Sequence, residues 1–162
     1  LARFEEAREV FERSLGLMEP VAPVEKDKDI QRVNVQSLCG LGNVLRLLGR
    51  YAEAEPLLRR ALAAAEAELG PEDLEVSSVL NMLGMLHKYQ GRFDEGQARY
   101  ERALAIMERA MGRDHPALAS LYHNLGGLAH ARGEGYFPGV RRASDRAATG
   151  DPEEQSTNRG GS

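Results

Sequence analysis

Residues 49–90 read GRYAEAEPLLRRALAAAEAELGPEDLEVSSVLNMLGMLHKYQ, and residues 91–132 read GRFDEGQARYERALAIMERAMGRDHPALASLYHNLGGLAHAR, which repeats the first stretch without a gap. The opening glycine, Gly49, recurs as Gly91 after 42 residues and again as Gly133. A fixed period of this size is typical of a stack of similar supersecondary units. In such stacks the binding surface is made by several units together, so we expect function on a surface rather than in one pocket.

The two stretches share more identical residues than chance would give. The pair Leu41-Gly42 extends the same register upstream, so that residues 34–49 are the first half of an earlier unit. The identities are Gly49/Gly91, Arg50/Arg92, Glu53/Glu95, Arg60/Arg102, Ala61/Ala103, Leu62/Leu104, Ala63/Ala105, Glu66/Glu108, Gly70/Gly112, Ser78/Ser120, Leu83/Leu125, Gly84/Gly126 and Leu86/Leu128.

Each unit is predicted to form two helices. Apolar residues recur at intervals of three and four within each half, which is the pattern of a helix with one buried face. A glycine follows each half, and glycine accepts the left-handed conformation beyond a helix C-terminus at little steric cost. The sequence therefore predicts an all-α fold with helices at about 1–18, 34–48, 51–69, 74–90, 93–111 and 116–132.

Both ends of the chain depart from the repeat. Residues 1–18 match the second helix of a unit whose first helix is absent, and a longer loop is expected over Glu19 to Asp29. After Gly133 a polar tail rich in glycine replaces the second helix, so we expect a repeat domain over 1–133 and a flexible, disordered tail over 134–162. Starting in mid-repeat and losing register at the end, the sequence has the pattern of a fragment, a splice form or a frame-altered end.

Composition narrows the class of function. The chain has 162 residues and a formal net charge of −4, which gives no overall electrostatic case for nucleic acid. No apolar run approaches the roughly 20 residues of a membrane span, and no signal peptide is evident, so we expect a cytoplasmic protein that does not enter a membrane. The single cysteine, Cys39, excludes an intramolecular disulfide and a cysteine-based zinc cage.

The reactive residue types do not assemble a catalytic or metal motif. His123 and His130 are seven residues apart on one predicted helix, but His87 belongs to a packing face and leaves no third ligand in register. Cys39 has no histidine or acid at catalytic spacing. We therefore predict no enzyme activity, no metal and no cofactor.

The order of residues in each unit resembles the tetratricopeptide repeat, whose pattern places Leu-Gly, an aromatic, alanine and a second aromatic on two antiparallel helices. The length of 42 residues resembles the kinesin-light-chain variety of that repeat. The resemblance implies a right-handed α-solenoid of antiparallel helix pairs; Gly96, His87 and Ala129 depart from its usual pattern. The matching residues are Leu38, Leu41, Gly42, Leu45, Ala54, Leu58 and Ala61 in one unit and Leu80, Leu83, Gly84, His87, Gly96, Tyr100 and Ala103 in the next.

The same resemblance implies a protein-binding function. In this family the first helix of each pair lines the concave groove that takes peptides. The implied groove residues are Gln36, Cys39, Asn43, Arg46, Ser78, Asn81, Met85, Lys88, Tyr89, His123 and His130.

One column of the groove indicates the class of ligand. Arg46, Lys88 and His130 occupy equivalent positions, and we call these three residues the basic strip. A basic strip favours an acidic segment or a C-terminal carboxylate, and neighbouring Asn43 and Asn81 suit an extended peptide backbone. The alternative reading is that the cations are solvated charges favoured by the helix dipole.

Other functions remain open at this point. Cys39 and Met85 stand where chaperone-binding repeats have polar groups, which argues against a chaperone adaptor. If the last helix is uncapped, it leaves an apolar face open, and the alternative function is then a homo-oligomer or docking of a neighbouring domain on that face. The residues of this face are Leu118, Leu121, Leu125 and Leu128. A further alternative is a regulatory segment of a larger protein whose catalytic part lies elsewhere.

Overall fold

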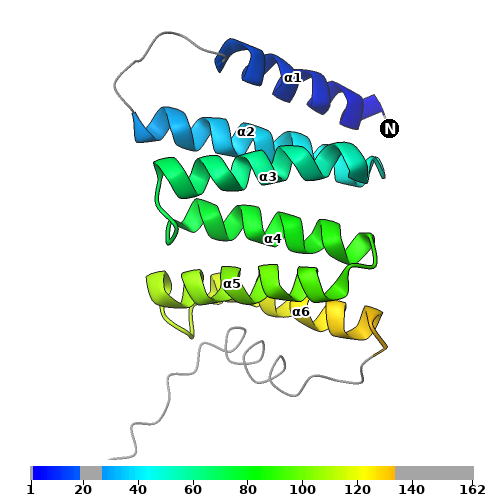
Figure 1. The fold of residues 1–162 in the computed structure, drawn as a ribbon, viewed down its shortest axis with the longest axis vertical. Coiled ribbons are helices and arrows are strands. Elements are labelled where there is room, and N and C mark those ends of the chain that lie inside the picture. Colours follow the sequence, from blue (N-terminus) through cyan, green and yellow to red (C-terminus); the bar gives the residue numbers. More distant parts are fainter. Residues whose placement is uncertain (1, 19–26, 134–162) are drawn as a thin grey trace, which may run out of the picture.

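Helices stacked in antiparallel pairs make up the part of the chain that the computed structural model describes, residues 2–18 and 27–133 (Figure 1). The predicted all-α repeat fold is thereby confirmed over these residues, whereas the predicted tail at 134–162 lies outside them. The elements are α1 (Ala2–Met18), α2 (Lys28–Leu47), α3 (Tyr51–Glu68), α4 (Leu74–Tyr89), α5 (Phe93–Met111), a short 3-10 turn η1 (Pro116–Leu118) and α6 (Ala119–Ala131).

Two helix starts differ from the sequence expectation. Helix α2 begins at Lys28 rather than at 34, because Asp27 accepts a hydrogen bond of 2.9 Å from the Asp29 amide and so caps a helix that starts one turn and a half earlier. Helix α6 begins at Ala119 rather than at 116. The preceding residues from Pro116 form η1, which the His115 side chain caps through the Ala117 amide at 3.2 Å.

The turn inside each unit depends on a glycine at one register position. Gly49 and Gly91 have φ angles of 75° and 74°, in the left-handed region that residues with a Cβ rarely adopt. The residue after each glycine turns its amide back to the helix, as Arg92 does to the His87 carbonyl at 2.8 Å. The two helices of a unit can therefore run antiparallel.

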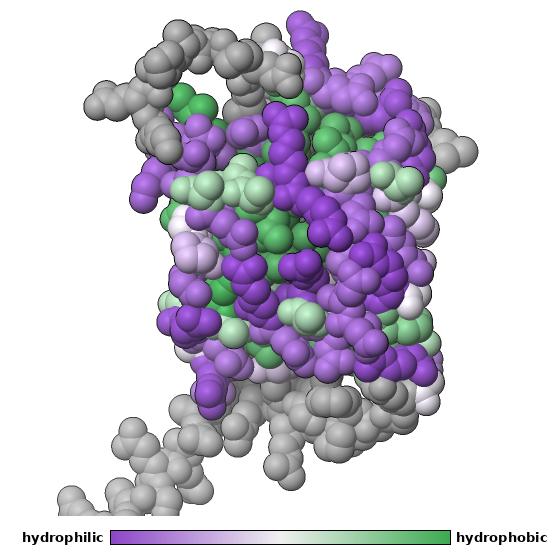
Figure 2. Space-filling model, in the orientation of Figure 1, coloured by the Kyte–Doolittle hydropathy of each residue, from purple (hydrophilic) through white to green (hydrophobic). Residues whose placement is uncertain are grey.

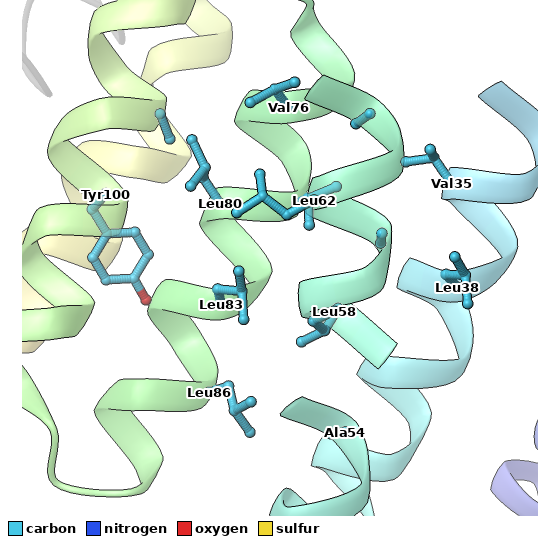
Figure 3. Packing of buried hydrophobic residues seen from close by; sticks show 14 of the residues in the cluster. Val35, Leu38, Ala54, Leu58, Leu62, Val76, Leu80, Leu83, Leu86 and Tyr100 are labelled. Carbon is cyan, nitrogen blue, oxygen red and sulfur yellow. The ribbon is translucent and has the colours of Figure 1, made fainter. Parts of the chain in front are cut away.

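Glycines also set the distance between the helices of a pair. A Cβ on Gly42 would lie 2.7 Å from Leu58, and one on Gly84 would lie 2.6 Å from the Tyr100 ring, so both backbones approach their partner helix closely. The ring of Tyr100 is fully buried against α4 among leucines of the core (Figure 3). Small residues thus admit a large side chain from the second helix at the same position of each pair.

The helices form two layers that differ in how closely they pack. Helix α2 packs against α4 and α4 packs against α6, whereas the backbones of α1, α3 and α5 all stay more than 8 Å apart. A stack of this kind curves toward its tighter layer, so we call the surface of α2, α4 and α6 that faces away from the second layer the inner surface. The outer surface, over α3 and α5, faces the viewer in Figure 2 and is mostly hydrophilic.

Ion pairs bridge the more widely spaced helices of the outer layer. Glu66 pairs with Arg102 at 2.6 Å, and Glu55 pairs with Arg92 at 2.8 Å. Glu66, Arg92 and Arg102 each have an identical equivalent one period away. These charged residues of the outer surface thus stabilise the contact between units.

Candidate functional site

All of the sequence-predicted groove residues lie on α2, α4 and α6, and all except Cys39, Met85 and Tyr89 are polar. Because one period separates equivalent positions, the fold aligns them in columns across the inner surface. Some are exposed and others half-buried. The exposed ones are Gln36, Ser78, Tyr89, His123 and His130, and the half-buried ones are Cys39, Asn43, Arg46, Asn81, Met85 and Lys88.

Arg46 is held in place by its neighbours. Its Nε and Nη2 atoms donate to Oδ1 of Asn43 at 3.2 and 2.8 Å. Its guanidinium carbon lies 5.3 Å from the centre of the Tyr89 ring, in a cation–π contact. Tyr89 in turn stacks on Tyr51, with 6.3 Å between ring centres. The guanidinium is therefore oriented at the C-terminal ends of α2 and α4, with further N–H donors left for a ligand.

Exposed apolar side chains lie next to the basic strip. Leu47 and Tyr89 are equivalent by the repeat, directly follow Arg46 and Lys88, and are 48% and 58% exposed. Large side chains this exposed, beside cations, favour contact with a partner over a purely solvated role. The inner surface at this end therefore offers a cationic column and an apolar column side by side.

Between α4 and α6 the structure forms a polar seam. The Asn124 side-chain amide donates to Oδ1 of Asn81 at 2.8 Å. About two turns further along α4, the ammonium nitrogen of Lys88 lies 2.8 Å from the place that a Cβ on Gly127 would occupy. The side-chain amides of Asn43 and Asn81 thus each use their carbonyl oxygen internally and keep their N–H₂ group for other acceptors.

The N-terminal ends of α2 and α4 are joined by a contact that sequence reasoning missed. Arg32 donates to both carboxylate oxygens of Asp73 at 3.1 Å, and Gln36 donates to Glu75 at 2.6 Å. Asp73 also caps α4 through the Glu75 amide at 2.9 Å. Nothing in the sequence analysis indicated that Arg32 and Asp73 pair across two helices. These contacts neutralise charge at one end of the inner surface.

The structure gives Cys39 no catalytic environment. Burial, and to a smaller extent the Glu75 charge, raise the pKa of the Cys39 thiol to about 12, so the nucleophilic thiolate is disfavoured. Within residues 2–18 and 27–133, no three histidine, cysteine or acidic side chains come together as metal ligands. Over the same residues, no helix combines the length and apolar composition of a membrane span.

The apolar face that we expected at the last helix is not open. Leu118, Leu121 and Leu128 are each at most 2% exposed, and Leu125 is half-buried against the core. Leu128 packs onto α5 so closely that a Cβ on Gly96 would lie 2.8 Å from it. The expectation of exposed leucines was therefore wrong, because these side chains fill the contact of α6 with the preceding helices.

Comparison with known proteins adds a family to this geometry. The family model for the Tetratricopeptide repeat matches residues 34–95 and 75–134, which together cover more than half of the chain. No curated protein sequence matches the chain.

Solved structures share the arrangement of helices. The crystal structure of BtubC (BKLC) from P. vanneervenii is 26% identical with a TM-score of 0.74, and the match covers 99% of this chain and 63% of that chain. Kinesin-light-chain TPR-like repeats from Podosopora anserina are 19% identical with a TM-score of 0.66, over 90% of this chain and 64% of theirs. The chain thus spans less than two thirds of each of these proteins. Their repeats agree with the kinesin-light-chain variety that the sequence indicated.

Proposed function

The chain belongs to the tetratricopeptide repeat family, and from that premise we propose that its inner surface binds an extended, acidic peptide segment of another protein. Repeats of this family mediate protein–protein interaction and are typically non-enzymatic scaffolds. The ligand class proposed for this chain rests on one observation, the basic strip of Arg46, Lys88 and His130 on three successive inner helices.

The surroundings of the strip support a peptide rather than a small anion. Side-chain amides of Asn43 and Asn81 flank it with N–H₂ groups that suit backbone carbonyls of an extended chain. The exposed Leu47 and Tyr89 add apolar contact area next to the charges. A ligand that carries acidic groups along an extended backbone would use all three features at once.

The same proposal includes a non-catalytic role in a reducing, cytoplasmic setting. It is supported by the raised pKa of the Cys39 thiol and by the use of a single cysteine. Neither enzyme chemistry nor a cofactor is needed for the inner surface to act in this way.

Charge reversal in the strip is expected to weaken binding. We expect Arg46→Glu and Lys88→Glu each to weaken binding of a peptide in which glutamate alternates with serine by about tenfold or more, since each turns a charge-assisted contact into repulsion. The measurement is fluorescence anisotropy of the labelled peptide, compared with the peptide in which glutamine replaces every glutamate.

A matched control separates the strip from net charge. Arg60→Glu changes the charge by the same amount at an exposed site on α3, in the outer layer, and should leave the affinity within about twofold. Equal binding of the glutamate and glutamine peptides by the unmodified protein would contradict the acidic-ligand proposal. So would an Arg60→Glu effect as large as that of the strip variants.

A further inference from the structure

Arg46 and Lys88 of the basic strip have different surroundings in the structure. Arg46 bonds to Asn43 of its own helix and covers Tyr89, whereas Lys88 reaches out of α4 toward α6. Its ammonium nitrogen lies 2.8 Å from the position of a Cβ at Gly127. Within residues 2–18 and 27–133, no oxygen forms a hydrogen bond or ion pair with this ammonium group.

The repeat register explains why Lys88 crosses to the next helix and Arg46 does not. Side chains on a helix lean toward its N-terminus, so Lys88 meets α6 at Gly127, one turn before its own equivalent, His130. The residue equivalent to Gly127 on α4 is Met85, which is half-buried and packs against the core. At the α4–α6 seam the ammonium group of Lys88 therefore lies over a residue without a side chain.

The seam also carries a fixed polar neighbour. The Asn124–Asn81 hydrogen bond joins α4 to α6, and Asn124 is one turn before Gly127 on the same helix. This bond ties the two helices together next to the ammonium group. The backbone of Lys88 belongs to helices that are already in register, so only its side chain has to be ordered when a ligand binds.

We infer that Lys88, seated over Gly127, is the principal anion-binding residue of the inner surface and takes a carboxylate of the ligand at the α4–α6 seam. The inference rests on the proposed function and narrows it to one seam. A carboxylate arriving there meets a positioned cation and displaces no existing ion pair among the described residues. At Arg46 it would compete with Asn43 and the Tyr89 ring for the guanidinium.

Gly127→Ala tests the inference without removing the charge. The new Cβ would occupy the place of the ammonium group, and because that group is the end of a flexible side chain the protein can fold with Lys88 displaced. We expect this variant to weaken binding of the glutamate–serine peptide about fivefold or more, while its Tm stays the same or rises, since alanine favours a helix over glycine. Gly16→Ala is the matched control, because a Cβ there meets nothing within 4 Å.

A double-mutant cycle with Lys88→Met completes the test. In the Lys88→Met background, which has already lost the cation, Gly127→Ala should have no further effect on the affinity. The inference is overturned if Gly127→Ala binds as tightly as the unmodified protein, or if it weakens binding equally in both backgrounds. A failure of the proposed function looks different, because the unmodified protein would then bind the glutamate and glutamine peptides alike.

Discussion

Replacement of Tyr100 by alanine is expected to lower the free energy of unfolding by about 3–5 kcal/mol, the range for deleting a fully buried aromatic side chain. The ring is 0% exposed and lies against the backbone of Gly84, which has no side chain of its own to occupy the space. The cavity would open between α4 and α5, the two helices of one unit. Urea unfolding followed by circular dichroism measures the change.

Two further variants separate the ring from its hydroxyl group. Burial raises the pKa of Tyr100, and within the described residues its hydroxyl has no hydrogen-bond partner, so Tyr100→Phe should be neutral or stabilising. Gly84→Ala alone should destabilise, because its Cβ would lie 2.6 Å from the ring. In a protein that already carries Tyr100→Ala the added methyl group enters the cavity, and the two losses should not add. Strict additivity, or a large loss for Tyr100→Phe, would show that this packing is not what stabilises the unit.

The repeat period was sufficient to predict the architecture. Equivalent glycines at 49 and 91 end helices with positive φ angles, and the glycines at 42 and 84 admit Leu58 and Tyr100. Each of these positions requires a residue without a Cβ for a local reason. The glycines can therefore be recognised in the sequence, where they recur with the period. The apolar spacing within each helix is equally local.

Helix boundaries at the irregular ends were harder to predict. The early start of α2 depends on a cap by Asp27 in a stretch of mixed charges with prolines nearby, where several acidic residues are candidates for the cap. The burial of Leu118 and Leu128 depends on where α6 crosses α5. Their equivalents one period earlier, Val76 and Leu86, are buried as well, so the repeat carried this information although the alternative of an open apolar face did not use it.

In the candidate site, too, the positions of the residues could be predicted from the sequence but their partners could not. Its columns follow from the register, which the sequence displays, but the partner of each cation does not. Arg46 and Lys88 are equivalent by position, yet Arg46 contacts Asn43 and Tyr89 whereas Lys88 lies over Gly127. Arg32 and Asp73 likewise form an ion pair although they are 41 residues apart in the sequence, and no sequence motif predicts this pair. Contacts between units depend on three-dimensional offsets of a few ångströms, which a linear pattern does not contain.

Charged side chains have different partners in the inner and outer layers. Outer-layer acids and arginines are used in pairs between units, such as Glu66 with Arg102. Arg46 and Lys88 of the basic strip instead lie against uncharged neighbours, and within residues 2–18 and 27–133 neither has an acid as partner. Arg32, at the other end of the inner surface, is already paired with Asp73. The ion pairs of the outer layer stabilise the stack, and their charges are no longer available to a ligand. The cations of the basic strip remain available to an acidic ligand.

One outer-layer cluster makes the stack sensitive to acid. Glu55 on α3 accepts hydrogen bonds from Arg59, from Gln90 and from Arg92, which precedes α5. Beneath it lies His87, fully buried on α4, whose Nε2 is 3.6 Å from Glu55 Oε1 and whose two ring nitrogens have no hydrogen-bond partner among the described residues. Glu95 and Arg99 are the other charges of α5 that act on this imidazole.

Two groups of this cluster have lowered pKa values. Burial and the charge of Arg92 lower the pKa of His87 from 6.5 in spite of the opposing Glu55 carboxylate, so the folded protein holds this imidazole neutral. Burial alone would raise the pKa of Glu55, but the hydrogen bonds from Arg59, Arg92 and Gln90 prevail and lower it from 4.5 to about 2. In both cases the unfolded chain binds the proton at a higher pH than the folded protein, so stability falls as the pH falls.

The free energy of unfolding should therefore decline first below pH 6.5, because the buried His87 must then take up a proton. It should decline again between pH 4.5 and about 2, where Glu55 becomes protonated. Loss of the Glu55 contacts costs about 2 kcal/mol once solvent screening is allowed for. His87→Leu introduces the residue that the first unit has at this position, Leu45, and should remove the first decline. Glu55→Gln should remove the second and lower stability at pH 7, because Arg92 loses its charged partner on α3. Urea unfolding from pH 7.5 to 2.5 measures both, with Glu6→Gln on the exposed side of α1 as the control. A Glu55→Gln curve parallel to that of the unmodified protein below pH 4.5 would assign the acid sensitivity to other carboxylates.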